Sequence, residues 1–118
     1  MCLNTNALEF DYSNPVPDFG FLSADLRDES KEYFQTVGVM HVRPTGEQFN
    51  NNVKEFFQQT LLEYPNLRFC LHAHSHKLEV EDIFNDGIMY YGCSAMKDRN
   101  YLLFTLTQEG YDYEVVWY

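Results

Sequence analysis

Two short apolar runs, separated by an amphipathic segment, dominate the hydrophobic pattern of the chain. Residues 36–41 are mostly apolar and include β-branched side chains, and residues 66–72 form a second run, with the apolar residues Leu67, Phe69, Cys70 and Leu71. Short apolar runs with β-branched residues are typical of buried strands. Because the segment between them has helical periodicity, the pattern predicts a β-α-β unit with parallel strands and a right-handed crossover.

The segment between the two runs predicts the clearest helix of the chain. Its apolar residues recur at positions that share one helical face, namely Phe49, Val53, Phe56, Phe57, Thr60 and Leu61. Thr45 is a suitable N-cap, and Gln48 completes a capping-box pattern. Pro65 disfavours helical geometry at Tyr64, so the helix should end there.

The N-terminal part of the chain has a weaker pattern. Residues 1–8 predict a short strand that begins abruptly, as a truncated domain would. Residues 10–20 contain Pro15, Pro17 and other turn-forming residues, which predicts a loop. Residues 21–34 have poor periodicity and predict a short helix or helical turn.

The C-terminal part alternates between apolar and polar residues, which predicts antiparallel hairpins. The run Asn85-Asp86-Gly87 is a strong turn signal between two of the expected strands. The strands are expected at residues 78–81, 88–93 and 101–107, followed by a last strand with Tyr111, Tyr113, Val115 and Trp117 on one face. The fold class is therefore α/β, with a β-α-β unit followed by antiparallel hairpins.

Composition and charge narrow the range of functions. With 118 residues the chain forms a single domain at most. A hydrophobic content of 45% and an aromatic content of 17% indicate a folded protein. The formal net charge of -10 argues against nucleic-acid binding, which depends on basic patches. A small phosphate ester held by metal ions remains compatible with this charge.

The cysteines and the hydropathy suggest a location. Cys2, Cys70 and Cys93 are an odd number without CxxC spacing, so neither a disulfide framework nor a zinc knuckle is indicated. Cys70 lies within an apolar run and should be a small buried side chain. No stretch reaches the roughly 18 apolar residues of a membrane span, and no signal peptide is evident. A reducing, cytoplasmic setting is the default expectation.

The histidines carry the candidate chemistry. His72, His74 and His76 lie at alternate positions where the second apolar run ends, and His41 ends the first run. In open α/β sheets ligands bind beyond the carboxyl ends of the strands. Neutral imidazole is the commonest side-chain metal ligand. The pattern predicts a metal site, although a lone histidine at a strand end is more often simply hydrogen-bonded. The spacing does not identify the metal.

Two of these motifs resemble a known family. The strand ending Val39-Met40-His41 resembles the penultimate motif of the calcineurin-like metallophosphoesterases. Ala73-His74-Ser75-His76 resembles their last motif, Gly-His-x-His. The resemblance covers essentially the whole chain but only the C-terminal half of the family's domain. The Asp-x-His, Gly-Asp-x-x-Asp and Gly-Asn-His motifs of the first half are absent from this sequence.

The resemblance implies a fold and a site. The chain would be one half of a two-sheet metallophosphoesterase sandwich, with the N-terminal half missing. His41 and His74 would ligate one divalent ion and His76 a second one, with Mn, Fe or Zn left undetermined. His72 would lie outside the metal shell, and Arg43 is a candidate for contact with a phosphate oxygen. Ala73 stands where the family has glycine, which costs roughly 1 kcal/mol if that position requires a positive φ.

The resemblance also implies a reaction, which is metal-dependent hydrolysis of a phosphoester substrate. Because the carboxylate ligands of the first half are missing, this chain alone is expected to hydrolyse phosphoesters poorly or not at all. Two other interpretations stay open. One is a non-catalytic metal-binding or self-associating module, in which a homodimer covers the uncovered sheet face. In the other, the histidines are structural and the function is unrelated.

Overall fold

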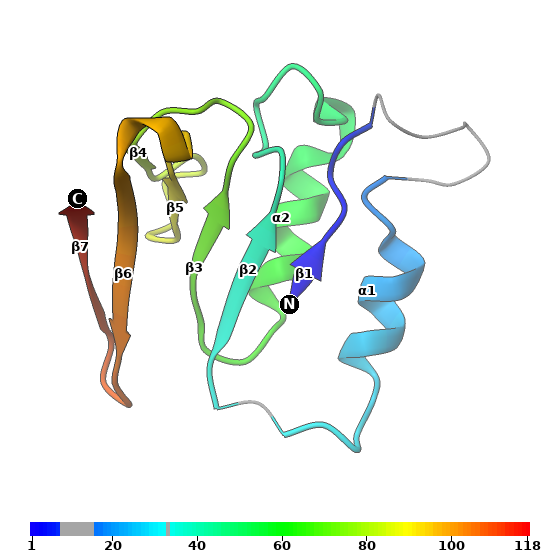
Figure 1. Cartoon of the computed structure of the whole chain (residues 1–118). Helices are drawn as coiled ribbons and strands as arrows, with labels where there is room; N and C mark the ends of the chain where they lie inside the picture. Colours follow the sequence, from blue (N-terminus) through cyan, green and yellow to red (C-terminus); the bar gives the residue numbers. More distant parts are fainter. Residues whose placement is uncertain (8–15, 33) are drawn as a thin grey trace.

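The described residues of the chain fold into a five-stranded sheet, two α-helices and a separate two-stranded hairpin (Figure 1). The computed structural model describes residues 1–7, 16–32 and 34–118. The strand order in the large sheet is β1-β2-β3-β5-β4, and the hairpin is β6-β7. The strands are β1 (Cys2–Leu3), β2 (Thr36–Met40), β3 (Leu67–His72), β4 (Glu79–Glu81), β5 (Met89–Gly92), β6 (Asn100–Leu106) and β7 (Tyr111–Trp117).

The predicted β-α-β unit is confirmed. β2 and β3 are parallel neighbours, with Val39 opposite Leu71, and the helix α2 (Lys54–Leu62) connects them. The first strand was expected to end at His41 and ends at Met40, and the second was expected to begin at Asn66 and begins at Leu67. The helix ends at Leu62, two residues before the predicted end at Tyr64.

The predicted start of this helix is wrong. Thr45 is not the N-cap, because it has a φ of 73° and its N–H donates to Asn51 Oδ1 at 2.8 Å. Asn51 Nδ2 donates in turn to the carbonyl of Gly46 at 2.9 Å. These two bonds stabilise a loop where the capping box was expected. Helical structure begins with a 3₁₀ turn, Asn51–Val53, and continues into α2.

The N-terminal predictions are confirmed in part. Only Cys2–Leu3 of the expected strand 1–8 pairs with β2, in parallel, and residues 8–15 and 33 lie outside the described residues. The expected loop ends early, because Asp18 caps the helix α1 (Phe19–Leu26) through a bond from the N–H of Phe21. This helix stops well before residue 34. Asp28 accepts a hydrogen bond from the N–H of Ser30, and such local bonds compete with helix.

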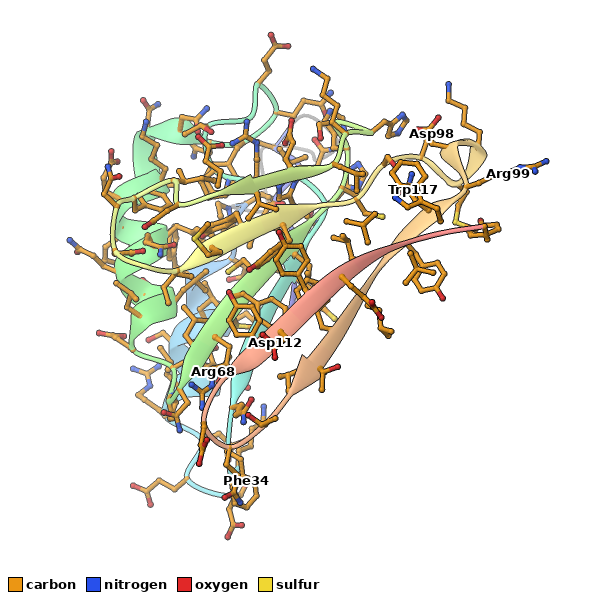
Figure 2. All side chains as sticks on the ribbon, turned by 90° about the vertical axis from the view of Figure 1, so that its left-hand side faces the viewer. Phe34, Arg68, Asp98, Arg99, Asp112 and Trp117 are labelled. Carbon is orange, nitrogen blue, oxygen red and sulfur yellow. The ribbon has the colours of Figure 1, made fainter. Side chains whose placement is uncertain are left out.

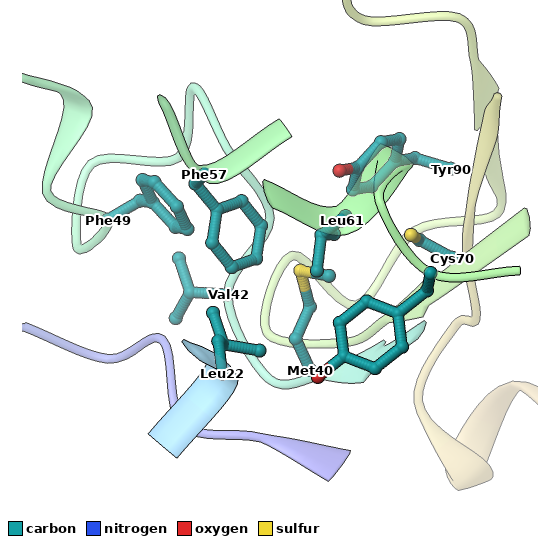
Figure 3. Packing of buried hydrophobic residues seen from close by; sticks show 9 residues of the cluster. Leu22, Met40, Val42, Phe49, Phe57, Leu61, Cys70 and Tyr90 are labelled. Carbon is teal, nitrogen blue, oxygen red and sulfur yellow. The ribbon is translucent and has the colours of Figure 1, made fainter. Parts of the chain in front are cut away.

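A hydrophobic core lies between the large sheet and the two helices (Figure 3). Leu22 of α1 and both Phe57 and Leu61 of α2 are completely buried in it. Phe49 is buried as predicted, although it lies before the helix. The buried cluster consists of Leu22, Met40, Val42, Phe49, Phe57, Leu61, Tyr64, Cys70 and Tyr90.

The predicted turn at residues 85–87 lies between β4 and β5, which are antiparallel as expected. The sequence pattern did not predict that β5 would also pair with β3, in parallel. This second pairing extends the sheet of the β-α-β unit. The hairpin nature of residues 78–93 is therefore confirmed, but the strands belong to the first sheet.

The hairpin β6-β7 packs on the face of the sheet opposite the helices. Phe69 precedes the core residue Cys70 on β3, and successive strand residues point to opposite faces. The Phe69 ring stacks on Phe104 of β6, with centroids 4.4 Å apart. The Tyr91 and Tyr111 hydroxyls are hydrogen-bonded at 2.8 Å. Figure 2 shows the hairpin crossing in front of the sheet. The α/β class with an antiparallel tail is therefore confirmed.

No helix in the described ranges combines the length and apolar character that crossing a membrane would require.

Candidate metal centre

The carboxyl ends of β2 and β3 bring two of the predicted site residues together. His41 directly follows β2, and His74 lies two residues beyond β3. The N–H of Ala73 donates to the carbonyl of His41 at 3.0 Å, which ties the two strand ends together. His41 Nε2 and His74 Nδ1 are 3.0 Å apart. Adjacent parallel strands end at the same edge of a sheet, and this explains why the two rings meet there.

The two facing nitrogens are within hydrogen-bond distance of each other, and their spacing is also close to that of two ligands on one metal ion. Two nitrogens that ligate one tetrahedral Zn²⁺ at about 2.0–2.1 Å each lie about 3.4 Å apart. The observed separation of 3.0 Å is within a small ring movement of that value. In the neutral tautomers that carry their hydrogens on His41 Nδ1 and His74 Nε2, both facing nitrogens have free lone pairs. Both rings are exposed, so an ion could reach them from solvent.

His76 does not join this pair in the described structure. It is exposed and lies in a turn in which His74 and His76 have φ values of 62° and 56°. No group of three or more His, Cys, Asp or Glu side chains is arranged to hold a metal ion within residues 1–7, 16–32 and 34–118. The site that the chain offers is therefore a pair of imidazoles, with the third predicted ligand close in sequence but separate in space.

Ala73 does not have the strained backbone conformation that was considered for it. Ala73 is not among the residues with a positive φ, and the two histidines that follow it take the left-handed conformation instead. The N–H of Ser75 donates to the carbonyl of Ala73 at 2.7 Å and closes the turn. A left-handed φ is unfavourable for a residue with a Cβ. The backbone strain of this turn therefore lies at His74 and His76, the two candidate ligands.

His72 has a structural role in the fold. Its ring is buried, its Nε2 lies 3.9 Å from Glu79 Oε2, and its Nδ1 lies 3.3 Å from the carbonyl of Ala73. Burial lowers the pKa of His72, because the interior disfavours the charged ring. A Cβ at Gly92 would lie 2.6 Å from His72 Cε1, so the ring packs directly on the backbone of β5. The ring of His72 is therefore held by the fold itself, and its place outside a metal shell stays a prediction.

Arg43 lies beside His74 but is held by carboxylates. Both residues line a pocket of about 550 Å³ at the carboxyl end of the sheet, together with Lys77. Arg43 Nε lies 3.5 Å from Glu79 Oε2, and its Nη1 donates to Glu81. The two carboxylates therefore fix the guanidinium at the pocket wall. Its Nε and Nη1 groups face these carboxylates and are not free to bind a ligand.

Glu79 and Glu81 were not identified from the sequence as site residues. They stand two positions apart on β4 and so share one face of the strand. That spacing was visible in the alternating run Leu78-Glu79-Val80-Glu81. Which face they would present to Arg43 depends on the pairing of β4 with β5, and this was not readable from the strand itself.

A second, shallower hollow of about 450 Å³ lies beside His41. It is lined by β1 residues such as Cys2 and Leu3, by Asn4, and by Ala73. The imidazole pair thus stands between two hollows that come from different strand ends.

Comparisons of the chain with protein-family models, with curated proteins and with solved structures gave no match.

Proposed function

We propose that the chain is the C-terminal part of a metal-dependent phosphoesterase of the calcineurin-like kind, and that it is nearly inactive by itself. The observation that carries this proposal is the 3.0 Å approach of His41 Nε2 to His74 Nδ1 beyond two adjacent parallel strands. In the proposed complete domain, the present sheet and hairpin would form one half of a two-sheet sandwich. The link to the family rests on Val39-Met40-His41 and Ala73-His74-Ser75-His76.

In this proposal the histidines would bind metal ions, and Arg43 would contact the phosphate. His41 and His74 would hold a divalent ion through their facing nitrogens, and His76 would serve a second ion after the missing half has joined. A bound divalent ion lowers the pKa of its water and polarises a phosphoryl oxygen. Arg43, fixed by Glu79 and Glu81, would orient a phosphate oxygen at the pocket wall.

Metal titration tests the site. Isothermal titration with Zn²⁺, and separately with Mn²⁺, should give binding by the wild type. Each of His41→Ala and His74→Ala removes one of two ligands and should weaken the binding at least about tenfold. His76→Ala should leave this first ion nearly unchanged. Equal binding by the wild type and by the His41 and His74 variants would remove the proposed centre.

Phosphatase assays test the activity. With an aryl phosphate and Mn²⁺ the purified chain should show turnover close to the uncatalysed background, because the carboxylates that bridge a metal pair are missing. Robust turnover that depends on His74 would contradict the proposed need for the missing half.

The second candidate is a metal-binding module without catalysis, and it is favoured because, among the described residues, no carboxylate joins the imidazole pair in a group that could hold a metal ion. Phosphate binding by the zinc-loaded chain separates the two. A phosphoesterase fragment should bind inorganic phosphate, and Arg43→Lys should weaken that binding because lysine lacks the bidentate fork. Arg27→Lys, at an exposed arginine after α1, is the matched control. A zinc-loaded chain without phosphate affinity would favour the module.

A further inference from the structure

The strand β6 forms one side of the hairpin and has an open edge. The hairpin contains two strands, and among the described residues no strand other than β7 pairs with β6. Figure 2 shows β7 (red) along one edge of β6 (orange), and the other edge of β6 is the open one. A strand edge presents a row of backbone donors and acceptors that can pair with another strand.

The register shows which backbone groups point to this edge. The N–H of Thr107 donates to Gly110, and the N–H of Tyr118 donates to Arg99. Hydrogen-bonded pairs alternate along an antiparallel ladder, so the odd-numbered residues of β6 bond to β7. The backbone groups of Asn100, Leu102, Phe104 and Leu106 therefore point away from β7 toward the open edge.

The side chains of β6 make this edge suitable for pairing. The strand Asn-Tyr-Leu-Leu-Phe-Thr-Leu contains no charged residue and no proline. Tyr101 and Leu103, on the face turned away from the large sheet, are 44% and 46% exposed. Natural edge strands usually carry charges, prolines or bulges that prevent association, and a long apolar edge without them favours it.

We propose that two copies of this chain associate by antiparallel pairing of their β6 strands about a two-fold axis. The register that overlaps the whole strand places Leu103 opposite Leu103 of the second copy and Leu102 opposite Phe104. The outward backbone groups then bond to each other, and β7-β6-β6-β7 becomes one four-stranded sheet. The inference is independent of the proposed metal chemistry.

Charge selects β6 over β7 for this pairing. The same two-fold arrangement of β7 would place Glu114 opposite Glu114 of the second copy, and like charges opposite each other are destabilising. Pairing β6 with a second copy's β7 is heterologous and does not close into a dimer. The chain has a net charge of -10, so an interface without charged residues is the one that two copies can share.

Sedimentation velocity over a concentration series tests the association. The wild type should change from monomer to dimer, and added salt should favour the dimer because it screens the repulsion between two acidic chains. Leu103→Lys places two ammonium groups at the axis and should raise the dissociation constant at least tenfold. Asp112→Lys introduces the same side chain on β7, away from the axis, and should keep the dimer. A wild type that stays monomeric throughout, or a dimer unaffected by Leu103→Lys, overturns the proposal.

Cross-linking tests the register in a background with Cys2→Ser and Cys93→Ser. Directly opposed residues of a pair without hydrogen bonds are close enough for a disulfide. Under mild oxidation Leu103→Cys should form a covalent dimer. Thr105→Cys should not, because it faces Tyr101 of the second copy. Efficient cross-linking of Thr105→Cys without cross-linking of Leu103→Cys overturns the proposed arrangement.

Discussion

Single residues at the carboxyl edge of the sheet were the most predictable part of the site. His41 and His74 each follow an apolar run, and the rule that parallel strands end together brought them to one place. His76 and Arg43 were less predictable for a physical reason. The direction of a side chain in a turn depends on φ values that the sequence does not state, and the partners of Arg43 lie on β4.

Gly38 shows how tightly one residue can be fixed by its neighbour. A Cβ at this position would lie 2.8 Å from Cys70 Sγ, in the middle of two paired parallel strands. Gly38→Ala should therefore lower the free energy of unfolding by about 1–3 kcal/mol, since the core must shift to accept a methyl group. Urea denaturation measures this change. Gly110→Ala is the control, because nothing lies near its Cβ position, and an equal loss there would contradict the steric explanation.

His72 makes the stability depend on pH. Burial holds its pKa below that of the unfolded chain, so the unfolded state binds a proton first as the pH falls. The contribution of the neutral ring is fully present above the unfolded pKa of about 6.5 and is lost as the pH falls toward the folded value. His72→Gln should flatten the pH dependence of unfolding between about pH 7.5 and 5.5. An unchanged slope in denaturation curves would show that another group causes it.

At the scale of the elements, periodicity was a good guide to type and a poor guide to boundaries. The helix between β2 and β3 was predicted with the correct buried residues Phe57 and Leu61, but its start was placed too early. Phe56, which was predicted to lie on the same buried face, is 58% exposed. The capping-box pattern competed with side-chain bonds from Asn51, and these stabilise a loop. The pairing of β5 with β3 was missed because a local turn signal contains no information about a strand's second neighbour.

Asn51→Ala tests the loop that replaces the predicted helix start. The change removes the bonds to the N–H of Thr45 and to the carbonyl of Gly46, and it should cost about 1–2 kcal/mol of unfolding free energy. Asn52→Ala, at the exposed neighbour, should change the stability by less than about 0.5 kcal/mol. Chemical denaturation of both variants gives the comparison. If Asn52→Ala proves as costly as Asn51→Ala, the two loop bonds of Asn51 would not explain the loss.

At the scale of the whole molecule, the backbone forms three layers, which are the two helices, the five-stranded sheet and the hairpin. Two sets of buried side chains join these layers. The aliphatic and aromatic cluster joins the helices to the sheet, and a second, mainly aromatic contact joins the sheet to the hairpin. The sequence indicated which face of β7 is apolar but not that Tyr111 would meet Phe69 and Tyr91. Contacts between residues so far apart in the chain follow from the complete topology, and no local pattern contains them.

The aromatic contact determines whether the hairpin unfolds with the rest. Trp117 on β7 is the single tryptophan, so its fluorescence reports on the hairpin, while far-ultraviolet circular dichroism reports mainly on α1 and α2. In the wild type the two transitions should coincide, as a cooperative unit requires. Phe104→Ala removes the ring that stacks on Phe69 and should bring the fluorescence midpoint below the dichroism midpoint. Thr105→Ala, on the exposed face of β6, should keep them together. Coincident transitions in Phe104→Ala would mean that Tyr111 and Tyr113 suffice to couple the hairpin to the sheet.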